Sequence, residues 1–94
     1  MKLPRIYADF NKQDTKGRLV LTCAGTRRDL QQIGLTLSEG LKVLLYSDDT
    51  DEKGRPDDIE VEGVVKFDPA NGRWVAEYRP AEIRHMSEKA DRVS

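Results

Sequence analysis

Residues 40–78, which read GLKVLLYSDDTDEKGRPDDIEVEGVVKFDPANGRWVAEY, predict three strands, an acidic loop and a tight turn. The first run, Leu41–Tyr46, places apolar side chains on both faces, as is typical of a central strand. The runs 59–67 and 73–79 alternate apolar and polar side chains, which indicates strands with one wet face. The sequence therefore predicts a sheet built around Leu41–Tyr46.

The segment between the two alternating runs contains Pro69, Asn71 and Gly72, which are typical turn residues and predict a hairpin. A two-residue loop at Asn71 and Gly72 would place Pro69 inside a strand, where proline is disfavoured. We therefore prefer the longer loop, 69–72. This register pairs Phe67 with Trp74, Val65 with Ala76 and Gly63 with Tyr78. Phe67 and Trp74 share a face in both registers, so we expect their rings to pack together.

The N-terminal half shows two more alternating runs, 5–11 and 18–24, separated by turn residues at 14–17. They predict an N-terminal hairpin. A short helix follows, in which Thr26 is the expected N-cap and Gly34 the expected C-terminal stop. Asp29, three residues after Thr26, suits the acidic position of a capping box.

The C-terminal segment 81–88 predicts a second short helix, and the terminal residues 1–4 and 89–94 are expected to fray. We predict a mainly β fold and a single domain over residues 1–94. The expected architecture is a small SH3-like barrel of about five strands with an N-terminal hairpin and one or two short helices. Closure into a barrel would remove exposed sheet edges.

The overall charge argues against a protein that binds phosphate backbones through a dedicated basic face. The chain has 94 residues, with 17 acidic and 16 basic side chains and a formal net charge of −1. No apolar run approaches the roughly 20 residues that span a bilayer, and the N-terminus lacks the apolar core of a signal peptide. A single cysteine agrees with a reducing compartment. We expect a cytoplasmic protein without a membrane partner.

The loop 47–58 is the strongest candidate for a binding site. It carries six acidic side chains against Lys53 and Arg55. Long irregular loops in small domains usually serve a function, and massed carboxylates attract cations and basic peptides. We therefore predict a partner site that is formed by Tyr46, Asp48, Asp49, Asp51 and Glu52.

The same loop matches a calcium-binding template at Asp49, Asp51, Gly54 and Glu60, but Lys53 falls on a ligand position and no helices flank the loop. A solvated acidic turn is the better interpretation. We assign no metal site and no cofactor.

Catalytic groups are not evident in the sequence. Cys23 is in phase with Leu19 and Leu21 and is interpreted as a small core residue. His85 has no second histidine, and no cysteine stands near it in the sequence, so it provides no zinc-type pattern. No nucleophile–base–acid set or phosphate-binding loop is recognisable, and we expect a protein that is not an enzyme.

The arginines support a second hypothesis. Arg27, Arg28, Arg73 and Arg79 would form a nucleic-acid platform if the fold gathered them beside an exposed aromatic ring. The alternative function is therefore an RNA- or ribosome-associated accessory protein. The balanced charge favours ordinary surface arginines, and the leading hypothesis is a non-catalytic module that binds another protein or a peptide.

Several short strings resemble a group of small bacterial proteins of unknown function. The strings are YADF at 7–10, CAGT with DL at 23–30, LSEG at 37–40, LYSDD at 45–49, GRPDDI at 54–59, RWVA at 73–76 and IRH at 83–85. The resemblance implies no catalytic residues, because the group has no assigned activity. The apolar strand, acidic loop and hairpin are also similar to SH3-like barrels, in architecture only.

Overall fold

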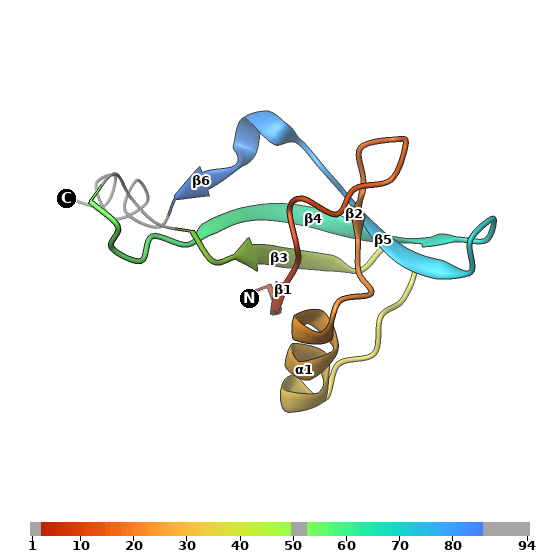
Figure 1. The fold of residues 1–94 in the computed structure, drawn as a ribbon. Coiled ribbons are helices and arrows are strands. Elements are labelled where there is room, and N and C mark those ends of the chain that lie inside the picture. The colour runs from red at the N-terminus through yellow and green to blue at the C-terminus, as the bar shows by residue number, and fades with distance from the viewer. Residues whose placement is uncertain (1–2, 50–52, 86–94) are drawn as a thin grey trace.

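The computed structural model describes residues 3–49 and 53–85, and these residues form a mainly β fold around one open sheet (Figure 1). The described strands are β1 (Arg5–Tyr7), β2 (Leu19–Val20), β3 (Lys42–Ser47), β4 (Ile59–Asp68), β5 (Arg73–Tyr78) and β6 (Arg84–His85). Their order in the sheet is β1-β3-β4-β5-β2, and β6 pairs with β4 beyond the end of β5.

The centre of the sheet confirms the predicted strand arrangement. β3 lies between β1 and β4, so the run that is apolar on both faces is a central strand. β4 and β5 pair antiparallel from Gly63 with Tyr78 to Asp68 with Arg73, with Phe67 opposite Trp74. This is the register of the four-residue loop, since it keeps Pro69 outside both strands.

The predicted N-terminal hairpin is wrong. β1 pairs in parallel with β3, whereas β2 pairs antiparallel with β5, so the two strands lie at opposite edges of the sheet. Only a short turn remains, in which the Val20 N–H donates to the Lys12 carbonyl at 2.9 Å. Ala8 is fully buried. The chain between β1 and β2 therefore crosses the sheet and buries side chains that we had assigned to a strand.

The sheet is open, so the predicted barrel is not confirmed. One face, here called the core face, carries Val43, Leu45, Val61, Val65 and Ala76, which are all buried. Ile6, Ala8, Leu19 and Leu21 complete the core cluster. The crossing segment covers this face and supplies apolar contacts that a closed barrel would take from its own strands. The opposite, outer face carries Lys42, Leu44, Glu62, Val64 and Glu77, as the alternation of strand side chains requires.

Helix α1 (Ala24–Ile33) begins earlier than predicted. Its N-cap is Cys23 rather than Thr26, and Thr26 is fully buried inside the first turn. Gly34 ends the helix with φ of 65°, which confirms the predicted stop, since this conformation favours glycine. Cys23 is only half-buried, and its Sγ lies 3.0 Å from Thr26 Oγ1, so the predicted core position of this cysteine is wrong.

The predicted C-terminal helix is also wrong within the described chain. Pro80–Glu82 form a single 3-10 turn, η1, and Arg84–His85 return to the sheet as β6. Figure 1 shows this segment, here called the strap (residues 79–85), leaving the end of β5, arching away from β4 and returning to it. Residues 86–94 and 1–2 lie outside the described residues, so the expected fraying at 89–94 is untested.

Candidate functional site

The predicted acidic-loop site is only partly described. Asp48 is exposed, whereas Asp49 Oδ2 lies 2.8 Å from His85 Nε2 on the strap. Asp51 and Glu52 lie outside the described residues. Asp58, at the end of the loop, lies 3.6 Å from the Arg5 guanidinium. At least two of the loop carboxylates therefore already have basic partners within the chain.

Tyr46 belongs to a different environment from the one that we predicted. Its hydroxyl donates to Asp29 Oδ2 of α1 at 2.6 Å, and the Arg5 guanidinium stacks 3.7 Å from the centre of its ring. Burial and the Asp29 carboxylate raise the pKa of Tyr46 above its usual range. The Tyr46 side chain thus connects the sheet to α1, and its hydroxyl is already engaged by Asp29.

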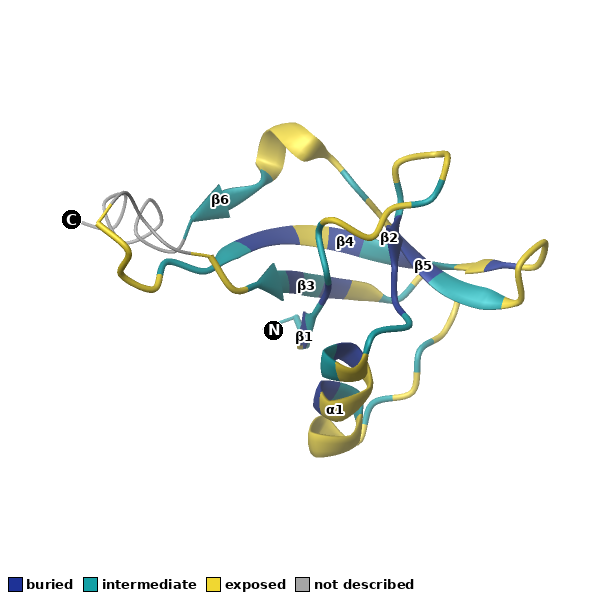
Figure 2. Ribbon diagram, in the orientation of Figure 1, coloured by how far each residue is buried: buried dark blue, intermediate teal, exposed yellow. Residues whose placement is uncertain are grey.

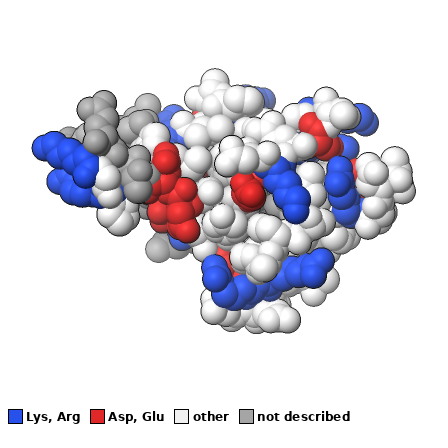
Figure 3. All heavy atoms as spheres, viewed as in Figure 1, with Lys and Arg blue, Asp and Glu red and all other residues white. Residues whose placement is uncertain are grey.

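The four arginines of the nucleic-acid hypothesis are scattered. Arg27 and Arg28 lie on α1, Arg73 begins β5, and Arg79 follows the end of β5. A strand rises about 3.3 Å per residue, so Arg73 and Arg79 are separated by roughly 20 Å. Figure 3 shows basic and acidic side chains interspersed on the visible face. The fold does not gather these arginines into one platform.

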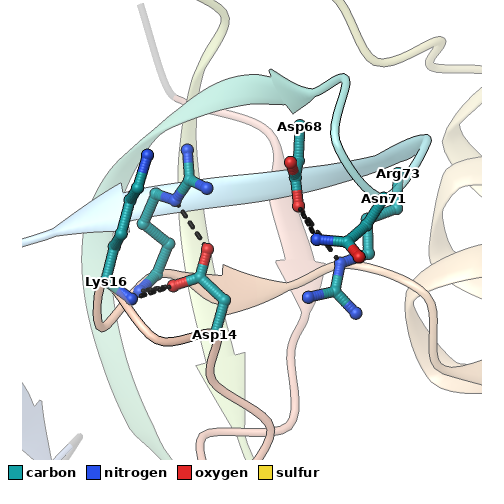
Figure 4. A network of polar contacts seen from close by, with 6 residues as sticks. Asp14, Lys16, Asp68, Asn71 and Arg73 are labelled. Carbon is teal, nitrogen blue, oxygen red and sulfur yellow. Dashed lines mark hydrogen bonds and ion pairs between the residues drawn. The ribbon is translucent and has the colours of Figure 1, made fainter.

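Arg73 instead belongs to a polar cluster next to the β4–β5 turn (Figure 4). Asp68 Oδ2 accepts a hydrogen bond from Asn71 Nδ2 at 2.9 Å and lies 3.5 Å from Arg73 Nε. Beside it, Arg18 Nε donates to Asp14 Oδ2 at 2.7 Å. The charge of Arg18 also contributes to the lowered pKa of Asp68, so the two groups lie close together. The ion pair with Asp68 holds the Arg73 side chain near the protein.

The lowered pKa values of Asp14 and Asp68 predict that acid destabilises the fold. Burial alone would raise the pKa of Asp14, but hydrogen bonds from Arg18 and Lys16 lower it overall. The hydrogen bond from Asn71 lowers the pKa of Asp68 by more than burial raises it. Because both folded-state values lie below the ordinary value of 3.8, the stabilisation is complete above that pH. It is lost as the pH falls through the lower, folded-state values.

Urea unfolding at neutral pH and at several values below 3.8 measures this loss. We expect the unfolding midpoint to fall with acid in the wild-type chain and to fall less steeply in Asp14→Asn and Asp68→Asn. Asp48→Asn, a change of an exposed acid outside the cluster, is the control and should keep the wild-type slope. Equal acid slopes in all four proteins would show that the cluster carries no pH-dependent stability.

A groove on the outer face is the best-defined candidate site. It has a volume of about 520 Å³ and crosses the sheet towards the strap. Its walls include Leu3, Lys42, Glu62, Val64, Glu77, Tyr78, Arg79 and Glu82. A second hollow of about 360 Å³ shares Glu62 and Glu82 and extends along Leu44 and Arg84. The two hollows together form a site with apolar walls and several carboxylates.

The groove contains both acidic and basic side chains, and few of them form fixed pairs. The side chains of Lys42, Glu62 and Glu77 form no hydrogen bond or ion pair with another residue of the described chain. Glu82 lies 3.6 Å from Arg79, and this pair is mostly exposed. Such exposed pairs contribute about 0–1 kcal/mol and exchange readily with other partners. The groove thus holds the carboxylates of Glu62, Glu77 and Glu82 against the cations Lys42 and Arg79, and Glu62 and Glu77 are available to a basic ligand.

The sequence contained one signal for this site that we did not use. Glu62 and Glu77 occupy the polar phase of their alternating runs, which we interpreted only as a wet face. The alternation shows which side chains point away from the core. It does not show that the strap returns to the sheet beside Glu62 and Glu77. Glu82 joins the site only because η1 replaces the predicted helix.

The part of the chain that the structure describes shows neither a metal site nor a membrane-spanning helix. No group of three or more potential metal ligands occurs among the described residues. None of the described helices is long and apolar enough to cross a membrane. The resemblance to small bacterial proteins stays an expectation, because no family model, no curated protein and no solved structure matches this chain.

Proposed function

We propose that the protein is a non-catalytic binding module that holds a basic segment of a protein partner in the outer-face groove. One observation carries this proposal: carboxylates from β4, β5 and the strap line a single groove with apolar walls. Glu62, Glu77 and Glu82 are the residues concerned. A basic side chain satisfies these groups, and its methylene stem can pack on apolar surface.

Electrostatics explains why a basic ligand is favoured. Carboxylates that share one groove repel one another, so a cation gains their attraction and also relieves the repulsion. The acidic side chains of the loop 47–58 add negative charge to the chain, which favours the approach of basic partners. Each exposed contact contributes about 0–1 kcal/mol, so we expect weak, salt-sensitive binding by several contacts.

Titration with a short Arg- and Lys-containing peptide tests the proposal. Amide chemical shifts in the wild-type chain should change at Glu62, Val64 and Glu77, and the changes should weaken as salt is added. We expect the double variant Glu62→Gln with Glu77→Gln to lose about tenfold or more in affinity, equivalent to about 1.4 kcal/mol.

Asp48→Asn is the matched control, because it also removes one exposed acid but lies outside the groove. It should bind the peptide almost as well as the wild-type chain. Loss of binding in Asp48→Asn with full binding in the groove variant would instead place the site at the acidic loop. Shift changes with RNA at Arg27 and Arg73, and none with the peptide, would favour the nucleic-acid function and reject the groove.

A further inference from the structure

The β4–β5 turn contains an asparagine that is followed directly by a glycine, at Asn71 and Gly72, and both residues are exposed. In such a pair the backbone nitrogen of the glycine can attack the side-chain carbonyl carbon of the asparagine, because glycine has no side chain to block the approach. The chain has one other asparagine, Asn11, and a bulkier lysine follows it. Asn71 is therefore the asparagine at which this reaction meets the least steric hindrance.

The fold does not hold the nitrogen that would make this attack. Within the described chain, the Gly72 N–H donates no hydrogen bond. Gly72 has a φ of 62°, and it lies between the end of β4 at Asp68 and the start of β5 at Arg73, so no ladder hydrogen bond restrains it. The Gly72 nitrogen is therefore available to react with the side chain that precedes it.

The side-chain amide of Asn71, which would be the leaving group, is held by Asp68. Asn71 Nδ2 donates to Asp68 Oδ2 at 2.9 Å, and Figure 4 shows the amide directed at this carboxylate. Asp68 is only 6 % exposed, so this hydrogen bond is partly shielded from water. The same hydrogen bond is the largest of the causes that lower the pKa of Asp68, as expected for a bond to a charged acceptor.

We propose that Asn71 is a site of spontaneous deamidation and that its hydrogen bond to Asp68 slows the reaction. The amide nitrogen must accept a proton before it leaves as ammonia, and a nitrogen that donates to a carboxylate is poorly placed to do so. The departure of this nitrogen also breaks the hydrogen bond. Hydrogen bonds to charged groups are stronger than neutral ones, so we expect the bond to Asp68 to slow deamidation by about tenfold.

The reaction consumes only water and involves no oxidation or reduction. The Gly72 nitrogen loses its proton and forms a bond to Asn71 Cγ, and the bond from Cγ to Nδ2 breaks to release ammonia. Water then opens the resulting cyclic imide at either of its carbonyl carbons. Opening at the main-chain carbonyl carbon leaves an isoaspartate, whose backbone runs through the side chain, and opening at Cγ leaves an ordinary aspartate at position 71.

Either product places a carboxylate where Asp68 now has a hydrogen-bond donor. Asp68 then loses a hydrogen bond and gains a like charge beside it, and both changes disfavour its charged form. An isoaspartate also lengthens the backbone of the turn 69–72, whose length fixes the register between β4 and β5. We therefore expect the Asn71→Asp variant, which reproduces the aspartate product, to have a lower unfolding midpoint in urea than the wild-type chain.

Peptide mapping by mass spectrometry measures deamidation at Asn71 during incubation of the folded chain at mildly alkaline pH, with Asn11 as the reference in the same molecules. We expect Asp68→Ala to deamidate at Asn71 about tenfold faster than the wild-type chain. Asp68→Asn keeps a neutral acceptor and should show an intermediate rate. The asparagine introduced at position 68 cannot react by the same route, because Pro69 has no N–H.

Arg73→Ala is the matched control, because it removes another partner of Asp68 but leaves the Asn71 hydrogen bond in place, and it should keep the wild-type rate. Fluorescence of Trp74, the single tryptophan, checks that each variant is folded, and Asp68→Asn provides the comparison if Asp68→Ala is not. Equal rates in the Asp68 variants and the wild-type chain would overturn the protection, as would an equally fast Arg73→Ala. An Asn71 that stays intact in the urea-unfolded wild-type chain would overturn the site itself.

Discussion

Asp29→Ala should destabilise the fold by about 2–4 kcal/mol, a large effect for a polar residue on a short helix. The Asp29 carboxylate is 9 % exposed and accepts hydrogen bonds from the Tyr7 N–H at 3.0 Å and the Tyr46 hydroxyl at 2.6 Å. Removing the acceptor leaves two donors without partners, and each unsatisfied buried group costs about 1–3 kcal/mol.

The hydrogen bonds of Asp29 also protect an edge of the sheet at Tyr7. β1 is an edge strand, and the outward N–H and C=O of Tyr7 would otherwise be open to another chain. Asp29 accepts from this N–H, and Thr26 Oγ1 donates to this C=O at 2.6 Å. Two side chains of α1 thus take the place of a neighbouring strand, and Figure 2 shows that the buried part of α1 is confined to this side.

Urea unfolding of three variants measures the effect. Asp29→Asn keeps an oxygen acceptor and should lose less stability than Asp29→Ala. Gln32→Ala changes an exposed residue of the same helix and should stay within about 0.5 kcal/mol of the wild-type chain. If Asp29→Ala proved as stable as Gln32→Ala, α1 would not be held to the β1 edge by these hydrogen bonds.

The contact also explains why helix prediction from the sequence was only partly correct. Thr26 and Asp29 have the spacing of a capping box, and side chains of this kind bond to nearby backbone groups. The sequence cannot show whose backbone they will reach. Here they bond to Tyr7, nineteen and twenty-two positions away. Because Thr26 bonds to Tyr7, it does not act as the N-cap, and the helix starts earlier, at Ala24.

Local patterns predicted the β4–β5 hairpin because the turn residues fix its register. Pro69 excludes the shorter loop, and the alternation then sets every pair from Gly63 to Asp68. No turn fixes the partners of β1 and β2 in this way. Ile6 and Leu19 share the same apolar period, yet they belong to opposite edges because the intervening chain is needed to cover the core.

The candidate groove could not be predicted from the sequence. Charge density pointed to the loop 47–58, whereas the groove depends on Glu62 and Glu77 being diagonal neighbours on adjacent strands. It also depends on the strap leaving β5 and returning as β6. Pro80 indicated the end of β5, but only tertiary packing determines where the chain goes afterwards. Site residues gathered from three elements therefore required the fold.

Trp74→Ala is the second large expected effect, at about 3 kcal/mol. The Trp74 ring packs against the core cluster and meets the Phe67 ring edge-on, with the ring centres 5.0 Å apart and the planes at 70°. This confirms the predicted pairing. Because the tryptophan is only half-buried, we expect a loss at the lower end of the range for aromatic truncations.

Phe67 provides the comparison within the same pair. It is 42 % exposed although it faces Trp74 across the hairpin, so Phe67→Ala should cost less than Trp74→Ala. The difference between the double variant and the sum of the single variants isolates the ring contact, which should be about 0.5–1.5 kcal/mol. A larger loss in Phe67→Ala than in Trp74→Ala would mean that Phe67, and not Trp74, anchors this end of the sheet. Equal, small losses would instead make the pair an exposed surface for a ligand, on the face opposite to the groove.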